Sequence, residues 1–360
     1  MLIINFDAFA ETAPNQPDWL VAILDAIEGR AAATFVLLAG VGISLGTRKT
    51  KPHSRHSDTS GYRGLLFRRA ICLFVFGLLF SLTWEADILH FYGLFILVGA
   101  LFITTSNRQV FEAAFFSTAF FVLLFLVFDF DSDWDWDALS DGDFWSFWGL
   151  FRALLFNGCY PFFPWMAFVL IGMWLGRQNL TGRKNQIKLL GCGVTLLIAS
   201  VAIPRIIGVT VLELAFANDD IKWIQFIEVD PWTPLPLFIM AALGTALSAV
   251  GISLLAADAF ESRRWLKLLA TAGRMSLSIY VLHILLGKPI IERIVLPDPL
   301  AAYWPTTIAI LFFMLSVLLA NVWNRHFARG PFELVFQYLL ELRWFPLKTG
   351  SKKLMGKPSI

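Results

Sequence analysis

The chain has 360 residues, of which 57% are hydrophobic and only 16% are charged, and its formal net charge at pH 7 is +2. Ordinary soluble domains carry about 25% charged residues, so the composition excludes a soluble enzyme. The basic segments are short and border apolar runs, which excludes a nucleic-acid-binding module. Three cysteines, Cys72, Cys159 and Cys192, have no paired spacing. This argues against a disulfide framework and a zinc site, and we expect no metal.

The first ten residues, MLIINFDAFA, form an apolar stub that is too short to cross a bilayer. No charged segment precedes its apolar residues, so the stub is not a signal peptide. We interpret it as the outer end of a helix whose inner half is missing from this chain, so that the first helix of the bundle is truncated. An interfacial stub is the alternative.

Long apolar segments then recur along the chain. A bilayer hydrocarbon core of about 30 Å requires about 20 apolar residues per helix. The segments that we expect to cross are 31–47, 70–86, 88–105, 110–128, 156–176, 187–206, 234–257, 275–291 and 304–322. The sequence therefore predicts an all-α, polytopic transmembrane helical bundle of about nine spans over residues 1–330, followed by a basic cytoplasmic C-terminal tail over 331–360.

Charge divides the predicted loops between the two sides of the bilayer. Most of the 29 Lys and Arg residues fall in 48–69, 177–188, 261–274 and the tail after Asn324, whereas 129–143 contains seven aspartates. Because short cytoplasmic loops carry an excess of Lys and Arg, the basic side is predicted to be cytoplasmic. We expect a multi-pass protein of the cytoplasmic (inner) membrane, with the N-terminus of this chain outside and the C-terminus in the cytoplasm.

Ionisable side chains at membrane depth are costly and mark functional sites. The segment WEADILHFYG (84–93), between the second and third predicted spans, contains Asp87 and His90. If the third helix has begun by Asp87, the two side chains lie three residues apart on one face. The carboxylate could then fix the imidazole tautomer, as a general base requires. The alternative is a helix cap at Asp87 and an interfacial histidine.

Two further positions place ionisable groups near the bilayer. Glu28 and Arg30 precede the first predicted span, where Glu28 suits the helix dipole as a cap and Arg30 could bind an acid or a phosphate. His283 lies nine residues beyond Arg274, about 13 Å along a helix, and therefore near the middle of the membrane. A hydrogen bond between two helices and a role in a catalytic cavity are both open for His283.

The fourth position is RALLFNGCYPFFPW (152–165), where two prolines interrupt the start of the fifth predicted span. Irregular backbone at membrane depth is tolerated where it lines a cavity. Asn157 and Tyr160, together with Tyr92 of the earlier segment, are candidate substrate-binding residues. Alternatively, Pro161 only ends an outer turn.

Five segments together resemble a bacterial family of multi-pass proteins in the transmembrane acyltransferase superfamily, related to heparan-alpha-glucosaminide N-acetyltransferase. They are MLIINF (1–6), EGRAAATFVLLAGVGISL (28–45), WEADILHFYGLFILVGALF (84–102), YPFFPWMAFVLIGMWLGR (160–177) and GRMSLSIYVLHILLG (273–287). The resemblance implies a helical bundle that passes an acyl group from acyl-CoA, acetyl-CoA in particular, to an acceptor. One departure is that 7–26 contains no histidine, whereas the heparan enzyme has its essential histidine after its first helix.

The leading hypothesis is a membrane acyltransferase with His90, Asp87, Glu28 and Arg30 at an outer-side pocket, and His283 facing the same cavity. Basic residues on the predicted cytoplasmic side could hold the phosphates of acyl-CoA, unless they are only topology signals: Arg177, Arg183, Arg263, Arg264 and Arg274. The rival hypotheses are a carrier or channel for a small anion or lipid-linked solute and a scaffold without turnover. The acceptor and a homo-oligomer are left open.

Overall fold

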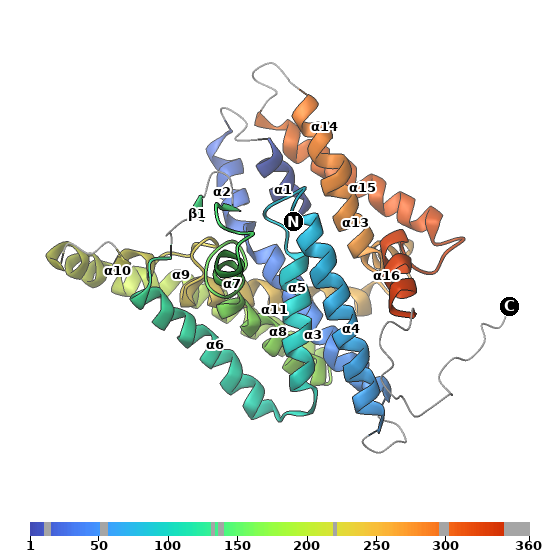
Figure 1. The fold of residues 1–360 in the computed structure, drawn as a ribbon, viewed down its shortest axis with the longest axis horizontal. Coiled ribbons are helices and arrows are strands. Elements are labelled where there is room, and N and C mark those ends of the chain that lie inside the picture. Colours follow the sequence, from blue (N-terminus) through green and yellow to red (C-terminus); the bar gives the residue numbers. More distant parts are fainter. Residues whose placement is uncertain are drawn as a thin grey trace.

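The computed structural model describes residues 1–10, 16–50, 57–130, 134–135, 140–218, 222–294 and 302–341. They are almost entirely helical, as the sequence predicts (Figure 1). The exception is a short antiparallel ribbon of β1 (Trp134–Asp135) and β2 (Ser140–Asp141). Parts of the basic and acidic loops, 51–56, 131–133 and 136–139, and the predicted tail beyond 341 lie outside the described residues.

The helices follow one another along the chain with short connections. The first half contains α1 (Leu2–Phe9), α2 (Asp18–Ile27), α3 (Arg30–Thr50), α4 (Ser57–Phe80), α5 (Leu89–Gly99) with η1 (Ala100–Thr104), α6 (Asn107–Val127), α7 (Phe147–Leu155) and α8 (Phe162–Arg177). The second half contains α9 (Arg183–Asn218), α10 (Lys222–Gln225), α11 (Pro236–Ala259), α12 (Arg264–Gly273), α13 (Ser276–Leu282), η2 (His283–Gly287), α14 (Lys288–Arg293), α15 (Trp304–Trp323) and α16 (Pro331–Glu341).

Small residues bring the central helices into close contact. Along the interface of α3 and α8, a Cβ at Gly40 would lie 2.0 Å from the carbonyl oxygen of Val169, and one at Gly172 would lie 2.0 Å from that of Leu37. Helices in membranes associate through such small-residue contacts, because lipid offers little hydrophobic driving force between them. α4 packs on α5, α9 on α11 and α1 on α15. The bundle thereby brings distant segments of the chain together (Figure 1).

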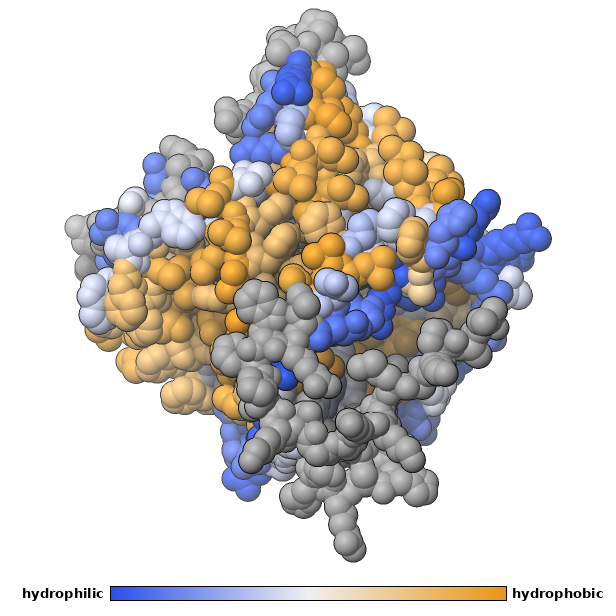
Figure 2. All heavy atoms as spheres, turned by 45° about the vertical axis from the view of Figure 1, so that its right-hand side comes forward, coloured by the Kyte–Doolittle hydropathy of each residue, from blue (hydrophilic) through white to orange (hydrophobic). Residues whose placement is uncertain are grey.

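The outside of the bundle is apolar, as a bilayer requires. Hydrophobic residues cover a broad part of one face (Figure 2). In the described residues, four helices are long and apolar enough to cross a membrane: α6, the Arg183–Gly208 part of α9, α11 and α15. A fifth is formed if α12 and the segment Ser276–Arg293, bent by 69°, count as one span. Each predicted span overlaps a helix or, at 88–105 and 275–291, successive helices, but the number of about nine is not confirmed.

Two predicted spans begin at the wrong residue. The span at 70–86 corresponds to α4, which begins at Ser57 and ends at Phe80. The charged residues that suggested a later start lie within the helix, and Arg63 Nη2 donates to Thr104 Oγ1 at 3.3 Å. Long basic side chains can keep their charge in polar surroundings while the stem lies along apolar surface. The span at 156–176 begins at Phe162, and its start is interrupted, as predicted, by non-helical backbone at Phe163.

Candidate functional site

The short connection between α4 and α5 brings Asp87 and His90 together. Both side chains are buried, with exposed fractions of 0% and 1%, and His90 Nδ1 lies 3.5 Å from Asp87 Oδ2. The same oxygen accepts a hydrogen bond of 2.8 Å from the backbone N–H of Leu89. α4 approaches so closely that a Cβ at Gly77 would lie 2.1 Å from the backbone nitrogen of His90. The connection therefore has little freedom to move.

The sequence predicts the pairing of Asp87 with His90 only if the helix has begun by Asp87, whereas α5 begins at Leu89. Asp87 therefore bonds to the start of the helix, as the alternative interpretation has it, and also lies 3.5 Å from the imidazole. The His90 ring nitrogens make no hydrogen bond to any described residue, so the contact between the two side chains is one of proximity. Asp87, which precedes the N-cap residue Ile88, thus contacts both the first turn of α5 and the imidazole.

Two other helices complete a chain of buried polar groups. The Tyr280 hydroxyl, on α13, donates to Asp87 Oδ1 at 2.9 Å. The rings of Tyr280 and His283 lie edge to face with their centroids 5.1 Å apart, and the Asn5 amide of α1 donates to His283 Nε2 at 2.8 Å. We call these residues the buried polar cluster: Asn5, Asp87, His90, Tyr280 and His283.

Aromatic rings surround this buried polar cluster. Phe144, from the segment that precedes α7, lies edge-on to the His90 ring with a centroid distance of 6.1 Å. Phe6 and Phe9 of α1 stack beside His283 with centroid distances of 6.3 and 6.2 Å. Apolar walls of this kind exclude water, which strengthens electrostatic interactions inside a site.

The turn between α2 and α3 holds Glu28 and Arg30. Gly29 adopts a φ of +64°, and a Cβ there would lie 2.5 Å from Pro231 Cβ and 2.9 Å from Phe238 Cζ. Only glycine is suited to both the left-handed backbone and this close approach. The turn therefore rests on the segment before α11. Glu28 is the C-cap residue of α2, and the half-buried Arg30 begins α3.

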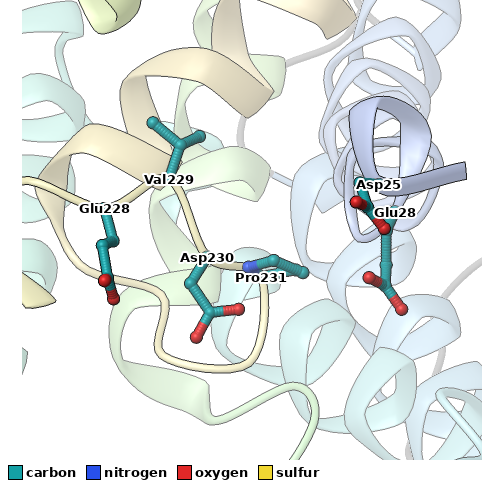
Figure 3. A pocket seen from close by; sticks show the side chains of 6 residues that line it. All are labelled: Asp25, Glu28, Glu228, Val229, Asp230 and Pro231. Atoms are coloured by element: carbon teal, nitrogen blue, oxygen red, sulfur yellow. The ribbon is translucent and has the colours of Figure 1, made fainter. Parts of the chain in front are cut away.

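Glu28 lies in a cavity of about 300 Å³ lined by Asp25, Glu28, Glu228, Val229, Asp230 and Pro231. In Figure 3, Asp25 and Glu28 lie on one side of Pro231, and Glu228 and Asp230 lie on the other. We call this space the acidic cavity. Burial, and to a smaller extent the carboxylates of Asp25, Asp230 and Asp7, together raise the pKa of Glu28 from its usual 4.5 to about 7. A group with this pKa can take up or release a proton near neutral pH.

The carboxylates of the acidic cavity are not arranged for a metal ion. Within the described ranges, no group of three or more His, Cys, Asp or Glu side chains could hold one. The carboxylates do impose a negative potential on whatever enters. Such a lining favours a cationic or neutral ligand and disfavours an anionic one.

Tyr160 lies within electrostatic reach of both the acidic cavity and the buried polar cluster. The carboxylates of both Asp87 and Glu28 act electrostatically on its hydroxyl, and its ring packs edge to face on Trp165 at 5.0 Å. Asn157, three residues earlier, is fully buried, and its amide donates to the carbonyl of Phe130 at 2.7 Å. Tyr160 is thus influenced by carboxylates of two regions that are distant in sequence, whereas Asn157 bonds to the segment that follows α6.

Tyr92 and Arg177, two further predicted binding residues, make structural contacts. Tyr92 packs among apolar side chains of α5, with its ring 6.5 Å from that of Phe95. Arg177 donates to the carbonyls of Phe102 and Thr105, both at 2.8 Å, near the end of η1. These bonds give the Arg177 guanidinium a structural role, because the last carbonyls of a helix have no partner within it.

The four remaining arginines are exposed at the ends of α9, α12 and α13: Arg183, Arg263, Arg264 and Arg274. Arg274 makes long bonds to Thr271 Oγ1 (3.4 Å) and Asn324 Oδ1 (3.3 Å). Exposed guanidinium groups can bind phosphate in pairs of hydrogen bonds. Their predicted role in holding acyl-CoA stays a prediction.

The sequence prediction missed three residues of the site. Tyr280 precedes His283 by three residues, so helical spacing alone places the two on one face. Asn5 is the only uncharged polar side chain of the apolar stub MLIINF, and a buried amide needs a partner. Phe144 carries no such signal, because aromatic residues are frequent throughout this chain.

Comparison with protein families decides what kind of protein this is. The model of the heparan-alpha-glucosaminide N-acetyltransferase catalytic domain matches residues 3–203, more than half of the chain. The chain belongs to this family. The match contains Glu28, Arg30, Asp87, His90 and Tyr160, and with the apolar helices it identifies an acetyltransferase-like membrane protein.

A second family model, described as a protein of unknown function (DUF418), matches residues 180–343. Its range contains Tyr280 and His283 as well as α16. The buried polar cluster is therefore assembled from both matched regions. No curated protein and no solved structure matches the chain.

Proposed function

We propose that the protein is a membrane acyltransferase that passes an acyl group, acetyl by family resemblance, from acyl-CoA to an acceptor bound on its predicted outer side. The observation that carries this proposal is the buried pair of His90 and Asp87, held by Tyr280 and close to the acidic cavity through Tyr160. An imidazole oriented by a carboxylate is a common general base.

In this mechanism the acceptor amine or hydroxyl loses its proton to His90 as it attacks the thioester carbonyl. The carbon–sulfur bond breaks, CoA leaves as the thiolate, and the proton passes from His90 to the sulfur. Asp87 holds the imidazole and stabilises its charged form. The oxyanion of the intermediate needs a donor, for which Tyr160 and Arg30 are the proposed groups. His283 supports Tyr280 from the opposite side.

The acidic cavity is the proposed binding site for the acceptor. The family's name describes N-acetyl transfer to a glucosaminide, a reaction whose acceptor is an amine. A protonated amine would be attracted by the carboxylates of Asp25, Glu228 and Asp230. It must lose a proton before it attacks, and Glu28, with a pKa of about 7, is suited to receive it.

The test is acyl transfer by the purified full-length protein in lipid nanodiscs, with radiolabelled acetyl-CoA and either glucosamine or water as acceptor. We expect acetyl-CoA consumption that depends on His90. We also expect CoA at millimolar concentration to raise the thermal unfolding temperature, and the paired changes Arg263→Gln and Arg264→Gln to weaken that effect. The proposal would be rejected if the protein neither consumed acetyl-CoA nor was thermally stabilised by it at millimolar concentration.

A carrier for a small solute is the second candidate, because two helices at membrane depth are broken. α8 is non-helical at Phe163, and α12 meets α13 at a bend of 69°. Broken helices line substrate pathways in many carriers. Solute uptake into proteoliposomes, without acetyl-CoA consumption, would favour this candidate over the enzyme.

A further inference from the structure

The last described helix, α16, caps a helix that is distant from it in sequence. The Glu333 carboxylate accepts hydrogen bonds from the backbone N–H groups of Leu277 (2.9 Å) and Ser278 (3.2 Å), and the Ser278 hydroxyl also donates to it. Leu277 and Ser278 lie in the first turn of α13, whose own N-cap residue, Met275, makes no side-chain capping bond. The first N–H groups of a helix have no partner within it, so α16 supplies the cap that α13 lacks.

This contact depends on close packing. A Cβ at Gly330 would lie 2.5 Å from Ser278 Oγ and 3.1 Å from Met275 Cβ, so no larger residue fits there. The Phe332 N–H donates to Ser278 Oγ at 3.0 Å. A neighbouring face of α16 packs on α4, where the rings of Phe76 and Phe336 meet edge to face at 5.3 Å. α16 thus bridges α4 and α13, the two helices that flank Asp87.

A carboxylate suits this position for two physical reasons. Hydrogen bonds to an ionised acceptor are about twice as strong as neutral ones, and the N-terminus of a helix carries a partial positive charge. The bend of 69° between α12 and α13 means that no continuous helix holds α13 from its N-terminal side. The orientation of α13 therefore depends on contacts such as those of Glu333.

The orientation of α13 decides where Tyr280 lies. Tyr280 follows Ser278 by two residues, within the same short helix, and its hydroxyl donates to Asp87 Oδ1 at 2.9 Å. A rotation or shift of the first turn would move the Tyr280 hydroxyl with it, because a helix of this length moves as a unit. The bond that holds Asp87 beside His90 would then lengthen.

We infer that Glu333 is a positioning residue for the site: it caps α13 so that Tyr280 holds the Asp87 carboxylate beside His90. The link from Glu333 to Tyr280 follows from the contacts above. Its consequence for catalysis rests on the proposed function.

A double-mutant cycle tests the link without any assay of activity. Thermal unfolding of the full chain in detergent is compared for wild type, Glu333→Gln, Tyr280→Phe and the double variant. Residues in one hydrogen-bonded network show non-additive effects. We expect Tyr280→Phe to lower the unfolding temperature by about half as much in the Glu333→Gln background as in wild type. Additive losses would overturn the inference.

A control and a milder variant make the cycle decisive. Glu341→Gln is the control, because Glu341 is on the same helix and its carboxylate accepts a hydrogen bond from Gln337 at 2.8 Å. The loss of stability from Glu341→Gln should simply add to that from Tyr280→Phe. If Glu333→Gln does not fold, Ser278→Ala replaces it in the cycle, because the Ser278 hydroxyl belongs to the same cap. Equal non-additivity for Glu341→Gln would contradict a specific role of Glu333.

Acetyl transfer provides the second measurement. We expect Glu333→Gln to lower kcat about 10-fold to 100-fold, the effect of a small misplacement of catalytic groups, with KM for acetyl-CoA unchanged. An unchanged kcat in an active preparation would overturn the catalytic part of the inference. If wild type transfers no acyl group, the proposed function fails, whereas the cycle still decides whether Glu333 positions Tyr280.

Discussion

The two polar regions of this protein place their carboxylates in opposite electrostatic surroundings. In the buried polar cluster, Asp87 receives hydrogen bonds on both oxygens, from Tyr280 and from the backbone of Leu89. In the acidic cavity, Glu28 faces the like charges of Asp25 and Asp230, and its pKa is raised to about 7. The Asp87 carboxylate is stabilised by hydrogen-bond donors, whereas burial and the like charges around Glu28 favour its protonated form.

This difference indicates a division of roles. A carboxylate fixed by donors is suited to orient another group, since its position varies little. A carboxylate with a pKa near 7 is suited to exchange protons with a ligand. The protein can therefore separate orientation, at Asp87, from binding and proton uptake, at Glu28, while Tyr160 lies within electrostatic reach of both.

The largest expected effect concerns the side of the membrane on which the regions lie. Single cysteines are placed in a cysteine-free chain and treated with a membrane-impermeant thiol reagent. Cysteines in 48–60 should react only from the cytoplasm, and cysteines in 131–143 should react only from outside. This prediction rests on the excess of Lys and Arg in the segments assigned to the cytoplasm. Labelling of 131–143 from the cytoplasm would reverse the orientation and place the acidic cavity on the inside.

The next largest effect concerns catalysis by the buried polar cluster. We expect His90→Ala to lower the rate of acetyl transfer by about 10² to 10⁴, the usual contribution of a positioned general base, and Asp87→Asn to lower it less. His326→Ala, the same change at an exposed histidine, serves as the control for loss of a ring. Full activity of His90→Ala would transfer the proposed role to His283.

The third prediction concerns the stability of the same cluster. Tyr280→Phe removes a hydrogen bond to a buried carboxylate, which should cost about 1.5–3 kcal/mol of the free energy of unfolding and lower the unfolding temperature in detergent by several degrees. Tyr338→Phe removes a hydroxyl from a residue that is 68% exposed and should leave the temperature unchanged. Equal effects of the two changes would show that Tyr280 does not hold Asp87.

The smallest expected effect is a pH dependence of stability from the acidic cavity. The pKa of Glu28 is raised from 4.5 to about 7 by folding, so the unfolded chain loses this proton at a lower pH than the folded chain does. The stability present below about pH 4.5 should therefore decline as the pH rises to about 7. Unfolding temperatures across this range should decline less for Glu28→Gln.

The exposed Glu85 provides the matched control for that measurement. Glu85→Gln should leave the decline with pH as it is in wild type. An identical decline in wild type and Glu28→Gln would indicate that Glu28 titrates normally. The contrast between the two polar regions would then be lost.

Most of the fold follows from the sequence because its physical cause is local. Each predicted span overlaps a helix or successive helices, since a run of apolar residues in a bilayer must satisfy its own backbone hydrogen bonds. The boundaries of α4 and α8 did not follow, because basic residues can lie within a helix and prolines can precede one. Asp87, His90, Glu28 and His283 could be singled out because ionisable groups are rare in apolar segments.

Only the tertiary structure decided how these residues combine. Sequence spacing relates residues on one helix, but Tyr280 meets Asp87, and Asn5 meets His283, across contacts between helices that are far apart in the chain. The same holds for the acidic cavity, where Glu28 faces Asp230 because Gly29 packs on the segment before α11. Composition determined that the protein is a membrane-embedded helical bundle, whereas close packing of its helices determined which polar groups share a site.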